Sequence, residues 1–181
     1  MKKILLIAAV SLSFSILVHA KKTEHRHNEA HVHGGATLNM AFDQLNGKIE
    51  FKAAAESVLG FEHTAKSDKD KKTLADAVSK FENNMSQMVQ FDVNSGCGFT
   101  KEKIEMVPEK KDARPTKKKQ GQHSDFIANF KIACLKPILG TKVTFDFTSL
   151  KNVNDLDIML LVDHLQKTAE IKSQPVTVEL K

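Results

Sequence analysis

The sequence of 181 residues has no tryptophan, no tyrosine, two cysteines and four prolines, and it lacks a long apolar run beyond its N-terminus. After residue 18, no stretch approaches the roughly 18 consecutive apolar residues that a membrane-spanning helix needs. Neither cysteine lies near the N-terminal apolar segment, which argues against a lipid anchor. We therefore expect no stable membrane insertion of the mature chain.

The N-terminal segment itself is typical of a cleavable secretory signal peptide. Lys2 and Lys3 precede an uncharged apolar stretch from Ile4 to Val18, and Ala20 supplies the small residue that a signal peptidase requires. Cleavage after Ala20 would export the protein, and we expect a periplasmic location. An uncleaved membrane anchor is the alternative interpretation.

The charge balance excludes a nucleic-acid-binding protein. Of the 27 basic residues, two lie in the signal peptide, so 25 basic and 22 acidic residues leave the mature chain at +3. Residues 109–119 alone carry +4, and the rest of the mature chain is close to neutral. A nucleic-acid-binding protein would present its basic side chains as a patch or stripe on the domain surface, whereas here the excess lies in one segment.

Length and composition favour one globular domain with a core of Ile, Leu, Val and Phe, and they exclude a coiled coil, a disordered tail and a multi-domain enzyme. We expect residues 21–35 to form a flexible His-rich N-terminal segment. Residues 36–181 should fold as a single β-rich domain with a basic loop at 109–122.

Alternation of apolar and polar residues predicts many short strands. They are expected at 36–42, 48–54, 88–93, 99–107, 125–134, 142–147, 156–162, 168–172 and 176–180. Apolar residues spaced at three and four predict one main helix over 71–83, beginning near Ser67. Residues 53–61 are interpreted as an extended stretch that turns into a loop. The fold class is therefore α+β, a single mostly antiparallel β domain with one main helix.

The two cysteines are expected to form a disulfide bond, because even cysteine counts in exported chains usually mean bridges. Cys97 precedes the strand predicted at 99–107, and Cys134 ends the strand predicted at 125–134. A hairpin joining these strands would bring the two thiols together. Thiolate metal ligands or free thiols are the weaker alternatives.

Histidine is the conspicuous excess. His25, His27, His31 and His33 fall within nine residues. If the chain is extended there, His31 and His33 project from the same face, and His-x-His supplies half of the three or four ligands that zinc normally has.

Two further histidines lie beside acidic residues. Glu62 precedes His63, and Asp125 follows His123 by two positions. If the strands near them are neighbours in one sheet, these histidines and the His31–His33 pair would gather at one end. The isolated His164 is assigned a structural role.

Four short motifs occur in an order and spacing that are fairly specific when taken together. They are His31-Val32-His33-Gly34 followed by residues 36–41, Gly60-Phe61-Glu62-His63 followed by a helix, Cys97 in a small-residue turn, and His123-Ser124-Asp125-Phe126 leading to Cys134. In these residues the chain resembles the ZrgA family of bacterial periplasmic zinc-uptake proteins, over nearly the whole mature chain.

The resemblance implies a zinc-binding protein, not an enzyme, that works with an inner-membrane ABC-type uptake system. It implies His31, His33, His63 and His123 as zinc ligands, with Glu62 and Asp125 as supporting groups. Members of the family often carry a His/Asp-rich stretch where this chain has residues 109–119. A +4 segment repels a dication, so the N-terminal cluster with His25 and His27 would gather the metal instead.

Three other functions are weighed against zinc uptake. Imidazole also favours Cu(II), and Met85 with Met88 could form a soft Cu(I) site, although methionines on an amphipathic helix are usually core residues. A zinc hydrolase using Glu62 as a base is opposed by the absence of His-Glu-x-x-His and of a nucleophile elbow. The last alternative is an exported β-rich adaptor whose histidines are incidental.

Overall fold

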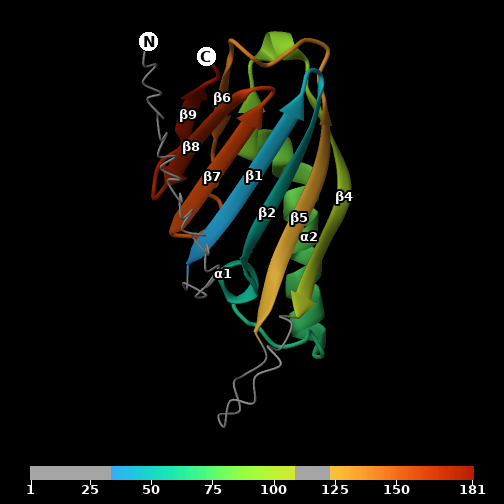
Figure 1. The fold of residues 1–181 in the computed structure, drawn as a ribbon. Coiled ribbons are helices and arrows are strands. Elements are labelled where there is room, and N and C mark those ends of the chain that lie inside the picture. Colours follow the sequence, from blue (N-terminus) through green and yellow to red (C-terminus); the bar gives the residue numbers. More distant parts are fainter. Residues whose placement is uncertain (1–33, 109–122) are drawn as a thin grey trace, which may run out of the picture.

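Two packed layers make up the fold of the computed structural model, which describes residues 34–108 and 123–181 (Figure 1). The signal peptide predicted at 1–20, the His-rich segment up to residue 33 and the basic loop at 109–122 lie outside the described residues. The structure therefore does not test the predictions for these three segments. No helix in the described part of the chain has the length and apolar character needed to cross a membrane.

A six-stranded sheet forms the first layer, with strand order β4-β5-β2-β1-β7-β8. These strands are β1 (Gly35–Asp43), β2 (Asn46–Ala54), β4 (Gly98–Pro108), β5 (Ser124–Ala133), β7 (Asp155–Val162) and β8 (Leu165–Ile171). Neighbouring strands are antiparallel except β1 and β7, which run parallel. The prediction of a mostly antiparallel β domain with one main helix is confirmed.

The second layer consists of one long helix and a three-stranded sheet of order β3-β6-β9. Its elements are α2 (Asp68–Met88), β3 (Val89–Phe91), β6 (Lys142–Phe145) and β9 (Val176–Glu179), and a short 3-10 helix, η1 (Val93–Ser95), follows β3. In Figure 1, α2 lies behind β2 and β5.

The aromatic packing between the two layers is made by phenylalanine alone, since the chain has no tryptophan or tyrosine. The fully buried ring of Phe51 on β2 lies 4.9 Å from the ring of Phe81 on α2 and stacks on Phe147 at 5.7 Å. Phe81 in turn lies 5.1 Å from Phe126 on β5. Because phenylalanine has no polar atom, this core needs no hydrogen-bond partners.

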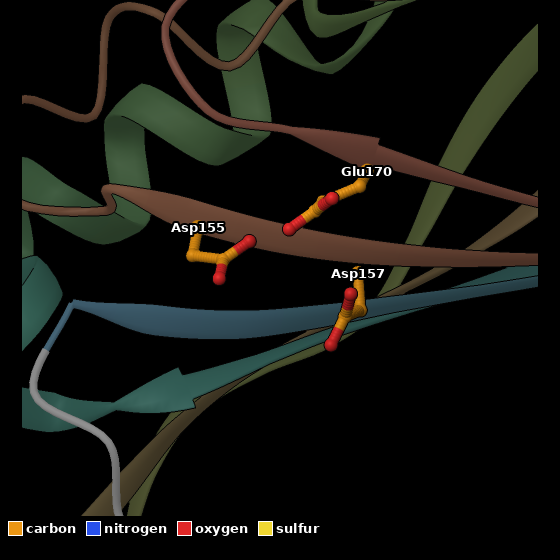
Figure 2. A group of neighbouring side chains, drawn as sticks. All are labelled: Asp155, Asp157 and Glu170. Carbon is orange, nitrogen blue, oxygen red and sulfur yellow. The ribbon is translucent and has the colours of Figure 1, made fainter.

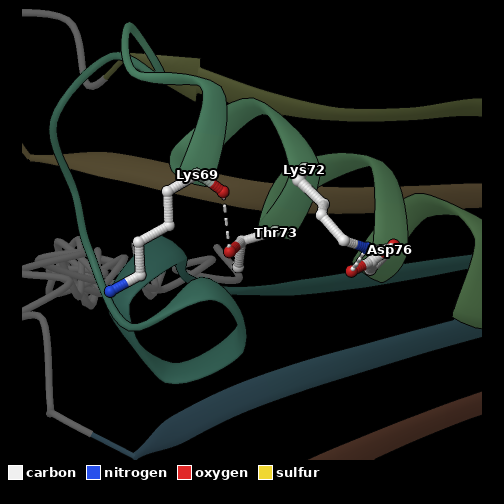
Figure 3. Close-up of polar contacts among 4 residues, drawn as sticks. All are labelled: Lys69, Lys72, Thr73 and Asp76. Carbon is white, nitrogen blue, oxygen red and sulfur yellow. Dashed lines mark hydrogen bonds and ion pairs between the residues drawn. The ribbon is translucent and has the colours of Figure 1, made fainter.

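Helix α2 begins where the sequence predicts, at a capping box. The Ser67 hydroxyl accepts the Asp70 N–H, and the Asp70 carboxylate accepts the Ser67 N–H. Next along the helix, Lys72 pairs with Asp76 at 2.9 Å, and the Thr73 hydroxyl donates to the Lys69 carbonyl (Figure 3). These exposed contacts are local, and burial of the apolar face anchors the helix.

The prediction of an extended stretch at 53–61 is wrong. Strand β2 ends at Ala54, and residues Ala55–Leu59 form a short helix, α1, which Gly60 ends in the left-handed conformation at φ +80°. Ala55, Ser57 and Leu59 are buried. Five residues are too few to display helical periodicity, so pattern analysis does not detect this helix.

The disulfide prediction is confirmed by geometry. Cys97 and Cys134 are joined across the β4–β5 pair, where Gly98 lies opposite Ala133. The bridge closes a segment with a sequence separation of 37 residues. It lies at the end of the sheet where β4 begins and β5 ends.

Removing the bridge by the paired substitution Cys97→Ala and Cys134→Ala should lower the free energy of unfolding by about 2–4 kcal/mol, chiefly because the unfolded chain gains freedom. Urea denaturation measures this change. Reductant should shift the midpoint of the wild-type protein and leave that of the double variant unchanged. Equal midpoints for oxidised and reduced wild-type protein would contradict a stabilising bridge.

Candidate metal centre

One end of the six-stranded sheet gathers three chain segments that are far apart in sequence. There, β1 and β5 begin and β2 ends, because Ala36 pairs with Ala53 across β1–β2 and Ala54 pairs with Asp125 across β2–β5. We call this the entry end of the sheet. Strands β1 and β5 are not direct neighbours in the sheet, because β2 lies between them. Both nevertheless begin at the entry end.

Gly34 fixes the point where the chain enters the described structure. Its N–H donates to the buried Ser57 hydroxyl at 3.1 Å, and its carbonyl accepts the N–H groups of Asn154 and Asp155 at 2.8 and 3.1 Å. Its φ of +86° favours glycine, and an added Cβ would lie 2.8 Å from the Asn154 amide nitrogen. The entry point is thus held by both α1 and the segment before β7.

Four of the predicted ligands, His25, His27, His31 and His33, lie outside the described residues. His33 is the residue immediately before Gly34 in the sequence. The structure therefore tests neither their positions nor their contacts.

A polar contact at the entry end joins Glu62 and His123. The imidazole Nδ1 lies 2.5 Å from the Glu62 Oε2, and the side chains are 14% exposed for Glu62 and 34% exposed for His123. The other carboxylate oxygen, Oε1, is buried and has no hydrogen-bond partner among the described residues. A carboxylate bonded to one ring nitrogen of a histidine is the arrangement that orients metal-binding imidazoles in many proteins.

His63 lies next to this pair in sequence, but its ring is engaged elsewhere. It stacks on Phe61 with ring centroids 4.9 Å apart, and its Nδ1 lies 3.2 Å from the Thr64 carbonyl oxygen. Among the described residues, His63, Glu62 and His123 do not form a group whose ligand atoms all lie within 4.8 Å of one another. The side chain is exposed, and a rotation would free it from both contacts.

Asp125, two positions after His123, makes an ion pair with Lys52. Its Oδ2 lies 3.3 Å from the ammonium nitrogen of Lys52, with side-chain exposures of 15% for Asp125 and 28% for Lys52. Lys52 carries no signal in the sequence, because its partner is 73 positions away and only the β2–β5 register brings the two together.

The two methionines that could form a Cu(I) site are core residues. Met85 and Met88 are 1% and 2% exposed and pack in the main hydrophobic cluster. This burial matches their ordinary role on an amphipathic helix. It lends no support to a thioether site for Cu(I).

A group of carboxylates that the sequence analysis did not single out lies on β7 and β8. Asp155, Asp157 and Glu170 have oxygen atoms within 4.8 Å of one another, because Asp157 and Glu170 are directly opposite across the two strands (Figure 2). Lys172 pairs with Glu170 at 3.1 Å and offsets part of the charge. Oxygen donors alone suit hard cations such as Ca²⁺ better than zinc, and we assign no metal to this group.

Burial raises the pKa of Asp155 above its ordinary value, and repulsion from Glu170 and Asp157 adds to this shift. Its Oδ1 is shielded from solvent and has no hydrogen-bond partner among the described residues. Because the pKa is higher in the folded state, ionisation of Asp155 costs stability as the pH rises through that pKa.

Asp155→Asn should therefore raise the melting temperature at pH 7. The difference from the wild-type protein should shrink as the pH approaches 3.8, the ordinary value for this carboxyl, because the wild-type group is then protonated too. Calorimetry over this pH range measures both effects. The control is Asp43→Asn, at an exposed position where β1 ends. A rise in the melting temperature of Asp155→Asn that does not depend on pH would contradict this explanation.

Together, a β-rich domain and a carboxylate-oriented imidazole at one end of its sheet define a candidate metal-binding protein. The model for the ZrgA family, described as ZrgA family zinc uptake protein, matches residues 30–180. The chain belongs to this family. Membership supports a role in zinc uptake, and it favours an exported binding protein over an enzyme. A search of curated proteins found no match.

Proposed function

We propose that this protein captures Zn(II) in the periplasm and assists its delivery to an inner-membrane ABC-type uptake system. The contact between Glu62 and His123 is the structural observation that supports the proposal most directly. Imidazole nitrogen is a preferred zinc ligand, and its 2.5 Å contact with a mostly buried carboxylate would fix the ring before the metal arrives. Family membership supplies the choice of zinc over other metals.

In the proposed site, His31, His33, His63 and His123 bind zinc, and Glu62 and Asp125 support them. Two features favour this set. His31 and His33 lie shortly before Gly34 in the sequence, and Gly34 is fixed at the entry end. Strand β5, which follows His123, lies two strands away from β1, and at ordinary strand spacing this separates the two strands by about 10 Å.

Capture would begin in the N-terminal segment, where His25 and His27 add further imidazoles. Delivery requires release, and protons compete with zinc for neutral imidazole. Zinc affinity should therefore fall as the pH falls, and a partner site with higher affinity would complete the transfer.

The test is zinc affinity measured by competition with a chromophoric chelator. His123→Ala removes a ligand and should weaken binding by about 100-fold or more, and Glu62→Gln, which leaves a ligand without its orienting charge, by about 10- to 100-fold. His164→Ala is the matched control. His164 is exposed in the turn between β7 and β8, where β7 ends, and should bind zinc as the wild-type protein does.

Two results would refute the proposed site. One is a wild-type affinity no tighter than that of a generic histidine tag. The other is a His123→Ala variant that keeps its zinc affinity while its melting temperature matches that of the wild-type protein.

A further inference from the structure

We propose that Lys52 sets the zinc affinity and metal selectivity of the site by holding the Asp125 carboxylate in an ion pair and out of the ligand set. This inference rests on the proposed function. Lys52 would act through Asp125 and would not touch the metal, so it is a positioning residue.

The sheet register brings the two residues together. Lys52 is two positions before Ala54, and Ala54 lies directly opposite Asp125 across the β2–β5 pair. The Lys52 ammonium nitrogen reaches the Asp125 Oδ2 at 3.3 Å. Both side chains are largely shielded, so solvent and salt screen this pair less than they screen an exposed one.

Asp125 also lies on the same side of the chain as His123. Ser124 and Phe126 are 1% and 0% exposed and face the core, whereas His123 and Asp125 are half-buried, which is the alternation of an extended strand. Residues two apart in a strand are separated by about 7 Å. The carboxylate is thus close enough to His123 to bind the same metal if it were released.

With Lys52 in place, Asp125 is kept from that role. Among the described residues, Asp125, Glu62 and His123 do not form a group with ligand atoms within 4.8 Å of one another. The charges of Lys52 and Asp125 offset each other, whereas the Glu62 carboxylate lies directly against His123. Loss of the ammonium group would expose a second negative charge and a hard oxygen ligand.

Lys52→Gln should therefore bind zinc about tenfold tighter, because a negative charge at this distance attracts a dication and a carboxylate oxygen can bind it. Manganese prefers carboxylate more than zinc does, so the gain in Mn(II) affinity should exceed the gain for zinc. Asp125→Asn should do the opposite and weaken zinc binding, since it removes a negative charge close to His123 and keeps the positive charge of Lys52. Competition titrations with each metal alone measure these affinities.

Three further variants separate positioning from a general structural effect. Lys52→Arg keeps the cation and should match the wild-type affinity. The double variant Lys52→Gln with Asp125→Asn removes a neutral pair and should also return to within about twofold of the wild type, because the freed carboxylate is gone. Lys48→Gln is the matched control, since Lys48 lies on the same strand and face and pairs with Glu102 at 3.9 Å.

The outcomes distinguish this inference from the proposed function. If the wild-type protein binds zinc and Lys52→Gln binds it with equal or lower affinity, the proposed role of Lys52 is refuted while the proposed function is not affected. A double variant as tight as Lys52→Gln also overturns the role of Lys52, because the gain would not need Asp125. Wild-type protein that does not bind zinc overturns the proposed function and this inference with it.

Discussion

The pairing of β2 with β1 on one side and β5 on the other is the constraint on which the candidate site depends. This pairing sets Ala53 opposite both Ala36 and Phe126. The end of β2 and the beginnings of β1 and β5 therefore lie together at the entry end. A slip of one residue in either register would turn every side chain of the slipped strand to the other face. The buried phenylalanines resist such a slip, since Phe51 and Phe126 would then leave the core. Packing in the interior therefore fixes the polar groups at the entry end.

Local patterns in the sequence predict much of this fold. The strand alternation in β1, β2 and β5 and the cap at Ser67 rest on residues whose physical roles do not depend on distant partners. The cysteine bridge is predictable although its partners are 37 positions apart, because the chain has only two cysteines. Helix α1 is missed because it has only five residues, which is too short for a period to appear. The parallel pairing of β1 with β7 is missed because residues more than 100 positions apart form it.

The candidate site is predicted less completely than the fold, for a similar reason. Glu62 and His123 each stand out as a residue suited to metal binding, yet their contact spans 61 positions and requires α1 and the loop after it. Lys52 reads as an ordinary outward lysine of a strand until the register pairs it with Asp125. The Asp155 group requires β8 to lie against β7. Ligand types are visible in a sequence, whereas the charges that surround them come from tertiary structure.

The bonds that hold Gly34 have a consequence for kinetics. Gly34 is fixed at the entry end, so under the proposed function a metal bound by the residues that precede it in the sequence would meet His123 at an effective concentration in the millimolar range. That concentration is a property of the covalent link and does not change when the protein is dilute. Zinc held first by those residues would then move to the folded domain by an intramolecular exchange of ligands, at a rate that is independent of how much protein the cell makes.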